Sequence, residues 1–122
     1  MRMNYFVVGT NDLLKATQFY DSLFENNGIV KINTTDRMTF WSGDSFVFAV
    51  ALPFDGFLAT KGNGTMIGFS VNAPEEVNNI YSKAVDIGGN CAGEPNTRGP
   101  VYSCYVRDLD DNKLCIYYRA EN

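Results

Sequence analysis

The order of predicted secondary structure repeats once along the chain, and this repeat constrains the fold more than any other feature. In each half, the spacing of apolar and turn residues predicts a strand, a helix and then three strands. The predicted elements cover residues 5–8, 13–24, 29–33, 38–42 and 46–52, then residues 65–71, 74–85, 90–93, 101–107 and 113–119. Two copies are too few for a solenoid, which needs about three or more repeats. We therefore expect an α+β protein of two βαβββ modules packed edge to edge.

Both predicted helices carry local signals at their ends. Thr10 or Asn11 can cap the first helix, and residues 26–28 (Asn-Asn-Gly) end it. Pro74 begins the second helix, and residues 88–89 (Gly-Gly) end it. Each helix has one apolar face, so each is expected to cover one face of a four-stranded sheet. The opposite face of each sheet must then be buried by curvature, by a ligand or by a second subunit.

Residues 53–63 separate the two halves. They include two Gly, one Pro and one Asn, a composition typical of a linker. We place the modules at about residues 1–53 and 64–119. Because 122 residues lie within the usual size of one domain, we expect a single domain over residues 1–122 that needs no covalent staple to fold.

The charge pattern argues against several classes of partner. The formal net charge is −4, and the Lys and Arg residues fall singly along the chain, which argues against nucleic acid. No apolar run approaches the ~20 residues of a membrane span. The first six residues carry one charge and no long apolar core, so they do not resemble a signal peptide. We therefore expect a cytoplasmic protein with no nucleic-acid and no membrane partner.

Histidine is missing from the sequence, and the cysteines form no pairwise motif. The missing histidine removes the commonest general base and the commonest transition-metal ligand. Cys91, Cys104 and Cys115 are an odd number of thiols, which makes a poor disulfide framework. We expect three free thiols in a reducing compartment.

Aromatic residues make up 14% of the chain, more than a minimal core needs. One interpretation is a β-rich domain, because aromatic residues favour pleated surfaces. Another is that some of them line a pocket for a small aromatic or amphipathic molecule. The two interpretations are compatible.

Short stretches spread over nearly the whole chain resemble one known family when they are taken in order. They are residues 5–13 (YFVVGTNDL), 19–21 (FYD), 40–41 (FW), 53–56 (PFDG), 62–65 (GNGT), 88–89 (GG), 93–95 (GEP), Arg98, Tyr102, 105–108 (YVRD) and 110–113 (DDNK). Together they resemble the glyoxalase, bleomycin-resistance and extradiol-dioxygenase family, also called the vicinal oxygen chelate family. The resemblance implies two βαβββ modules whose curved sheets form a cup, and a homodimer.

The family's enzymes bind one divalent metal in the cup through His or Glu. The matching positions here are Tyr5 (Asn4 if the register slips by one), Met66, Cys115 and a position within residues 46–50, and none is His, Asp or Glu. The resemblance therefore implies a lost metal site, and we expect no cofactor. Tyr, Met and Cys suit a soft ion such as Cu(I), but a Met beside a Cys on adjacent strands is usually core packing.

Nine residues are predicted to bind a ligand: Tyr5, Trp41, Phe48, Met66, Arg98, Tyr102, Tyr105, Cys115 and Tyr117. Arg98 lies in a Gly- and Pro-rich loop and suits a carboxylate or phosphate, although a solvated loop arginine is an equal alternative. Cys115 would need a base or a nearby cation to act as a nucleophile. Without a histidine, an inert buried thiol is the simpler interpretation.

Three functions remain open at this point. The first is a metal-free member of the family fold that binds a small organic molecule. The second is a lyase, isomerase or dioxygenase of glyoxalase-like type with a non-standard site. The third is a structural or regulatory partner protein whose cup is filled by its own side chains.

Overall fold

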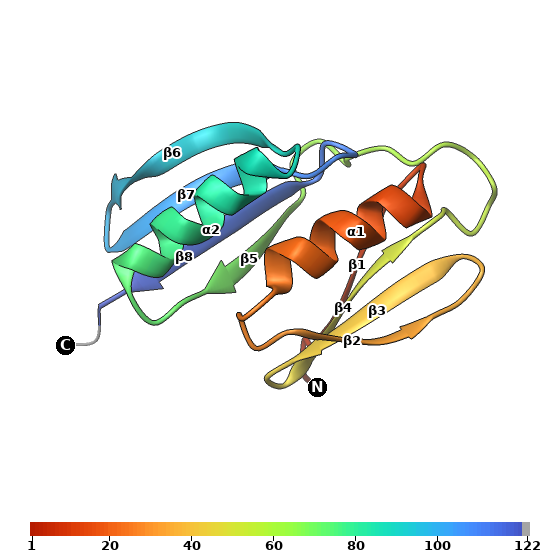
Figure 1. Ribbon diagram of the computed structural model, residues 1–122, viewed down its shortest axis with the longest axis horizontal. Helices are drawn as coiled ribbons and strands as arrows, with labels where there is room; N and C mark the ends of the chain where they lie inside the picture. The colour runs from red at the N-terminus through yellow and green to blue at the C-terminus, as the bar shows by residue number, and fades with distance from the viewer. Residues whose placement is uncertain (121–122) are drawn as a thin grey trace. The chain divides into compact units, whose positions relative to one another are not determined.

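The computed structural model describes residues 1–120, and the chain divides into two compact units, Met1–Lys61 and Gly62–Asn122 (Figure 1). The first unit contains β1 (Tyr5–Gly9), α1 (Leu13–Phe24), β2 (Val30–Thr34), β3 (Met38–Gly43) and β4 (Phe46–Ala51). The second contains β5 (Met66–Ser70), α2 (Pro74–Asp86), β6 (Asn90–Arg98), β7 (Val101–Arg107) and β8 (Lys113–Arg119). The repeated order predicted from the sequence is therefore confirmed.

Each unit builds one four-stranded mixed sheet, and the two sheets share a topology. The strand order is β1-β4-β3-β2 in the first unit and β5-β8-β7-β6 in the second. The first strand of each unit pairs in parallel with the last one, whereas the other pairs are antiparallel. This arrangement confirms the α+β class and the two βαβββ modules.

The helix caps differ in part from the prediction. Asp12 caps α1, because its Oδ1 accepts a hydrogen bond of 3.1 Å from the backbone N–H of Lys15. Thr10, one of the two predicted caps, is buried, and its Oγ1 accepts a hydrogen bond from the backbone N–H of Asp12. Asn11, the other, exchanges hydrogen bonds with the backbone of Ala59 in the connection after β4. The cap therefore lies one residue beyond the predicted positions.

In the first unit, aromatic rings from α1, β3 and β4 pack together between the helix and the sheet. Tyr20, Trp41 and Phe48 are at most 1% exposed, and their ring centroids lie 4.8–6.1 Å apart. The indole Nε1–H of Trp41 donates a hydrogen bond of 3.0 Å to Oδ1 of Asp21. Burial of rings of this size is a main source of stability.

In the second unit, the core is smaller and mostly aliphatic. Val77 and Ala84 of α2 are fully buried, as are Val106 of β7 and Leu114 of β8. Helix α2 has Pro at its start and Glu75 and Glu76 in its first turn, as the sequence indicates, and the acidic pair is favourable beside the positive end of the helix dipole. This helix covers one face of its sheet.

Strand β6 is longer than predicted. The sequence predicts a strand over residues 90–93 and a loop around Arg98, but β6 continues to Arg98. Register shifts after Cys91 and after Gly93 let this edge strand accommodate Gly93 and Pro95. Arg98 is therefore a strand residue with fixed neighbours.

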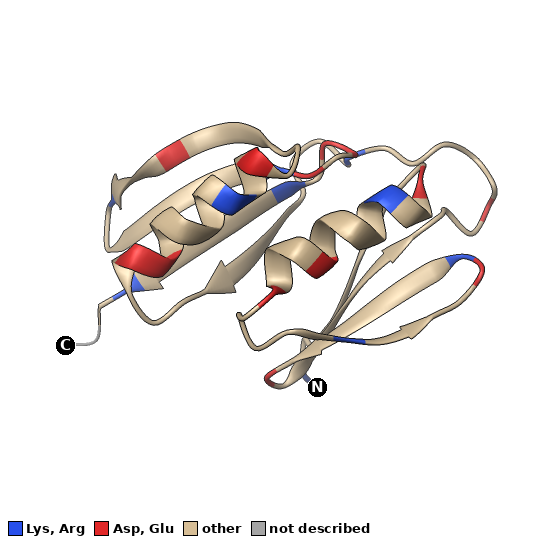
Figure 2. Cartoon of the chain, in the orientation of Figure 1, with Lys and Arg blue, Asp and Glu red and all other residues tan. Residues whose placement is uncertain are grey.

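Charged residues are spread over both units, with Lys and Arg interleaved among Asp and Glu (Figure 2). In residues 1–120, no helix is long and apolar enough to cross a membrane.

Candidate functional site

The sheet of the first unit has one face turned away from α1. Tyr5 of β1 lies opposite Val47 of β4, and Val47 lies opposite Ser42 of β3. Successive side chains of a strand point to opposite faces, so this row faces away from the row that contains buried Trp41 and Phe48. We call the face turned away from the helix the open face of the first sheet.

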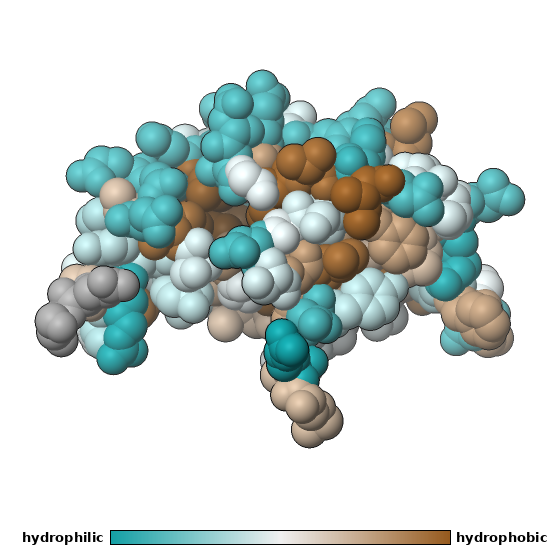
Figure 3. Space-filling view, turned by 90° about the horizontal axis from the view of Figure 1, so that it is seen from below, coloured by the Kyte–Doolittle hydropathy of each residue, from teal (hydrophilic) through white to brown (hydrophobic). Residues whose placement is uncertain are grey.

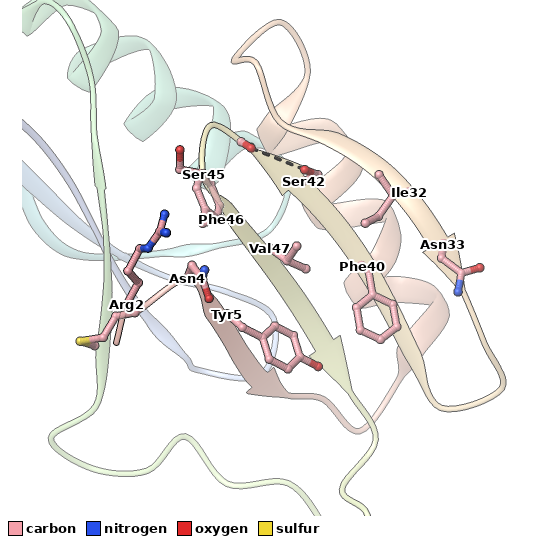
Figure 4. A pocket seen from close by; sticks show the side chains of 12 residues that line it. Arg2, Asn4, Tyr5, Ile32, Asn33, Phe40, Ser42, Ser45, Phe46 and Val47 are labelled. Atoms are coloured by element: carbon pink, nitrogen blue, oxygen red, sulfur yellow. Dashed lines mark hydrogen bonds between the residues drawn. The ribbon is translucent and has the colours of Figure 1, made fainter.

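A hollow lies on this open face (Figure 4). Its volume is about 1090 Å³, at the upper end of the roughly 300–1,000 Å³ typical of small-molecule sites. The residues that line it are Arg2, Met3, Asn4, Tyr5, Ile32, Asn33, Phe40, Ser42, Gly43, Ser45, Phe46 and Val47. All of them belong to the first unit, so the hollow needs no contribution from the second.

The lining combines apolar walls with a few polar groups. The rings of Tyr5 and Phe40 lie nearly parallel, with centroids 6.5 Å apart and 19° between their planes. Ile32 and Val47 extend the apolar wall, as the close view shows (Figure 4). The polar groups are hydroxyls, side-chain amides and the guanidinium of Arg2. Groups of these kinds offer hydrogen-bond donors, hydrogen-bond acceptors and one positive charge.

Three of the predicted ligand residues belong to the first unit, and they lie on two different faces of its sheet. Tyr5 lines the hollow. Trp41 and Phe48 lie on the helix side of the same sheet, fully buried against α1, and are core residues. Strands β3 and β4 are apolar on both faces, so hydropathy alone does not separate Trp41 from Phe40. Strict alternation around Trp41 is the one sequence signal that would have placed Phe40 on the opposite face.

The sheet of the second unit also has a face turned away from its helix. Leu114 and Ile116 of β8 are buried on the α2 side, so Cys115 between them points to the other face. Cys115 lies between Gly68 of β5 and Tyr105 of β7. The same alternation puts Met66 and Tyr117 on this face, which we call the open face of the second sheet. Four of the predicted ligand residues therefore share it.

Tyr102 lies on the opposite side of the second sheet. It pairs with Tyr118 in the register of β7 and β8, and its hydroxyl donates a hydrogen bond of 2.7 Å to Oδ1 of Asn78 in α2. Tyr102 therefore connects the sheet to its helix and is outside the open face.

Arg98 reaches the open face of the second sheet from the end of β6. Its Nη1 donates hydrogen bonds to the backbone carbonyl and the hydroxyl of Ser103, and its Nη2 donates one of 2.7 Å to the carbonyl of Glu94. The guanidinium carbon lies 5.0 Å from the centre of the Tyr105 ring. Lys113, which is not among the nine predicted ligand residues, places its Nζ 4.7 Å from the same ring centre. No local sequence pattern identifies Lys113 as a neighbour of this ring. Its position opposite Met66 and diagonal to Tyr105 is set by the pairing register of β8 with β5 and β7.

Two buried thiols stay protonated at neutral pH. Burial raises the pKa of the Cys104 thiol to about 12. Burial also raises the pKa of Cys115, while the charges of Arg98 and Lys113 act in the opposite direction. A protonated thiol is a poor nucleophile and a poor metal ligand, so both cysteines behave as inert core thiols.

The residues present do not fit the divalent metal that the resemblance implies. In the described part of the chain, residues 1–120, no group of three or more His, Cys, Asp or Glu side chains could hold a metal ion. The matching positions offer the phenol of Tyr5, the thioether of Met66 and the protonated thiol of Cys115, and Lys113 lies directly opposite Met66. Hard divalent ions prefer oxygen donors, chiefly carboxylates, and borderline ions such as Zn²⁺ take imidazole, carboxylate or ionised thiolate. A thioether and a protonated thiol are none of these.

Comparison with known proteins gives matches among solved structures only; no family model and no curated protein matches the chain. A glyoxalase/bleomycin resistance protein from Albidiferax ferrireducens T118 is 32% identical, with a TM-score of 0.91 over 97% of this chain and 98% of that one. A glyoxalase-related enzyme from Fulvimarina pelagi is 21% identical, with a TM-score of 0.82 over 98% of this chain and 88% of that one.

A third structure is that of the fosfomycin resistance protein FosX from Listeria monocytogenes, complexed with Mn(II) and sulfate. It is 16% identical, with a TM-score of 0.74 over 98% of this chain and 90% of that one. The fold and the open sheet faces thus define an α+β protein of paired βαβββ units. The chain belongs to the glyoxalase/bleomycin resistance protein family, as its sequence motifs indicate.

Proposed function

We propose that this protein binds a small aromatic or amphipathic organic molecule in the hollow on the open face of the first sheet, without a metal ion. The observation that carries the proposal is the composition of the hollow, in which the stacked rings of Tyr5 and Phe40 stand beside hydroxyl, amide and guanidinium groups. Apolar walls with a few polar groups are typical of small-molecule sites.

The side chains at the positions that the resemblance assigns to metal ligands distinguish the proposal from the chemistry of metal-dependent relatives. FosX is complexed with Mn(II), whereas Tyr5, Met66 and Cys115 stand at the positions where the resemblance places metal ligands. A ligand in the hollow must therefore be held by hydrogen bonds, charge and apolar contact. The enzymatic alternative, a lyase, isomerase or dioxygenase with a non-standard site, is supported by family membership alone.

The proposal also covers the oligomeric state of the protein and its place in the cell. We place the protein in the cytoplasm as a homodimer of single-domain chains. Exposed apolar side chains support a partner surface, since Phe57 and Leu58 are 76% and 82% exposed. Hydrophobic side chains are visible among hydrophilic ones at the surface (Figure 3). Sedimentation equilibrium of the purified chain tests this assembly, and a monomer at micromolar concentration would contradict it.

A screen of small aromatic compounds tests the binding function. The wild-type protein should show saturable shifts in the amide spectrum that include residues of the hollow such as Phe40 and Val47, together with a raised melting temperature. Phe40→Ala should weaken binding by about tenfold, because a stacking wall is lost. Phe54→Ala is the matched control, since Phe54 is 90% exposed and outside the hollow.

The proposal fails if no compound of a broad aromatic set binds, or if Phe54→Ala weakens binding as much as Phe40→Ala does. Elemental analysis of protein purified without a metal-affinity tag tests the metal-free part. One Zn, Mn, Ni or Fe per chain would contradict it.

A further inference from the structure

We propose that the open face of the second sheet contains a binding site for the carboxylate of a small organic anion, formed by Arg98 and Lys113 around the ring of Tyr105. This site is separate in its residues from the hollow of the first unit, and the proposal does not rest on the function assigned to that hollow.

The two side chains place positive charge beside one aromatic ring. The guanidinium carbon of Arg98 lies 5.0 Å from the centre of the Tyr105 ring, and Nζ of Lys113 lies 4.7 Å from it. Their mutual distance therefore cannot exceed about 10 Å, roughly a Debye length at 0.1 M salt, so they repel each other. The ring quadrupole attracts each cation but neutralises neither.

No carboxylate of the described residues 1–120 forms an ion pair with either cation. Glu94 offers Arg98 its backbone carbonyl, and Ser103 offers its carbonyl and hydroxyl. Arg107, which is opposite Lys113 in the register, pairs with Asp111 at 3.6 Å. Arg98 and Lys113 are thus the two cations of this face that lie against the Tyr105 ring, and neither has a carboxylate partner among residues 1–120.

Arg98 is preorganised to bind an anion. Three hydrogen bonds to Ser103 and Glu94 hold its guanidinium in place. A guanidinium has about five N–H donors, so two donors remain for an anion. A Cβ at Gly93 would lie 2.7 Å from the Tyr105 ring and 3.1 Å from Nη2 of Arg98. Glycine at position 93 thus allows the ring and the guanidinium to lie close to the β6 backbone.

The surroundings favour an organic anion over a bare inorganic one. Met66, directly opposite Lys113, is 46% exposed, and Tyr117 is half-buried on the same face. These apolar surfaces suit the body of a ligand whose carboxylate accepts hydrogen bonds from Arg98 and Lys113. Charge-assisted bonds of this kind are stronger than neutral ones, so the charge of the ligand should dominate its affinity.

The test compares benzoate with benzamide, a neutral molecule of nearly the same shape. Benzoate should shift the amide signals of Gly93, Tyr105 and Lys113 and bind at least about tenfold more tightly than benzamide. Its affinity should fall as salt is added. Lys113→Met keeps an apolar stem but removes the charge, and should weaken benzoate binding about tenfold while leaving benzamide unchanged.

Lys15→Met is the matched control, because it removes one positive charge from α1 in the other unit. A second variant, Arg98→Gln, should also weaken benzoate binding, and Lys113→Met keeps the proposal testable if Arg98→Gln does not fold. Equal binding of benzoate and benzamide overturns the proposal, as does equal loss in Lys15→Met and Lys113→Met. Binding of inorganic phosphate without binding of benzoate overturns the organic-carboxylate assignment. Shifts at Phe40 and Val47 alone would support the hollow of the first unit and refute this site.

Discussion

Trp41 and Asp21 join strand β3 to helix α1 through a hydrogen bond of 3.0 Å from the indole Nε1–H to Oδ1. The indole is 1% exposed, and the other carboxylate oxygen of Asp21 pairs with Nζ of Lys31 at 2.6 Å. Asp21 of α1 therefore accepts a hydrogen bond from the only polar atom of Trp41, which is the largest of the fully buried side chains. This explains why Trp41 belongs to the core and is unsuited to contact a ligand.

Asp21→Ala should lower the free energy of unfolding by about 1–3 kcal/mol, because it leaves a buried N–H without a partner. Asp21→Asn keeps an oxygen acceptor and should cost less. Lys31→Met removes only an exposed ion pair and should change stability by at most about 1 kcal/mol. Urea unfolding monitored by Trp41 fluorescence measures all three. A loss in Lys31→Met equal to that in Asp21→Ala would contradict this account.

Phe48→Ala should be far more destabilising than Tyr5→Ala, although the sequence analysis grouped both as ligand residues. Phe48 is 0% exposed and packs against the rings of Tyr20 and Phe24. Its truncation leaves a cavity and should lower the free energy of unfolding by about 3–5 kcal/mol. Tyr5 is 54% exposed on the open face and should cost much less. Thermal unfolding followed by circular dichroism compares them. Similar losses in the two variants would show that the two faces of the sheet are assigned wrongly.

Asn11→Ala should loosen the connection that follows β4. The side chain of Asn11 accepts a hydrogen bond of 2.7 Å from the N–H of Ala59 and donates one of 3.3 Å to its carbonyl. The neighbouring Phe57 and Leu58 are exposed, so chymotrypsin should cleave beside them faster in Asn11→Ala. Asn27→Ala is the control, since Asn27 bonds to carbonyls at the end of α1 instead. Unchanged cleavage of Asn11→Ala would argue that other contacts hold this connection.

Alkylation should distinguish the three thiols. Cys91 is exposed, whereas Cys104 and Cys115 are buried with raised pKa values. Iodoacetamide at about pH 8 should therefore label Cys91 rapidly and the other two only after unfolding. Peptide mass spectrometry after timed quenching gives the site of labelling. Rapid labelling of Cys115 in the native protein would reveal an activated thiol and would favour the enzymatic alternative.

Stability should fall between about pH 9 and pH 12. Burial raises the pKa of Cys104 from 9.0 to about 12, so in this range the unfolded chain ionises its thiol while the folded chain does not. The folded chain then binds one proton more than the unfolded chain, so rising pH favours unfolding. Below about pH 9 the thiol is protonated in both states and adds no pH dependence to the free energy of unfolding. Cys104→Ala should show a shallower alkaline decline in urea midpoint than the wild type. The same decline in Cys104→Ala would assign it to other groups.

The sequence determined the elements and their order, because the signals for them are local. Period-two and helical spacing, the Pro at the start of α2 and the glycines at its end are read over a few neighbouring residues. The prediction failed where distant contacts decide, as in β6. There, pairing with β7 extends the strand through Gly93 and Pro95 to Arg98, and the bulges that permit this need a partner strand.

The sequence also determined which donors stand at the positions that the resemblance assigns to metal ligands, since it contains no histidine and has Tyr, Met and Cys at positions 5, 66 and 115. Only the tertiary structure decided which side chains lie on the open face of each sheet. Phe40 and Trp41 are neighbours of similar hydropathy on a strand that is apolar on both faces, and the packing of α1 buried one and left the other on the open face. In the same way, the strand register brought Lys113 and Arg98 to one ring, because cross-strand neighbours are far apart in the sequence.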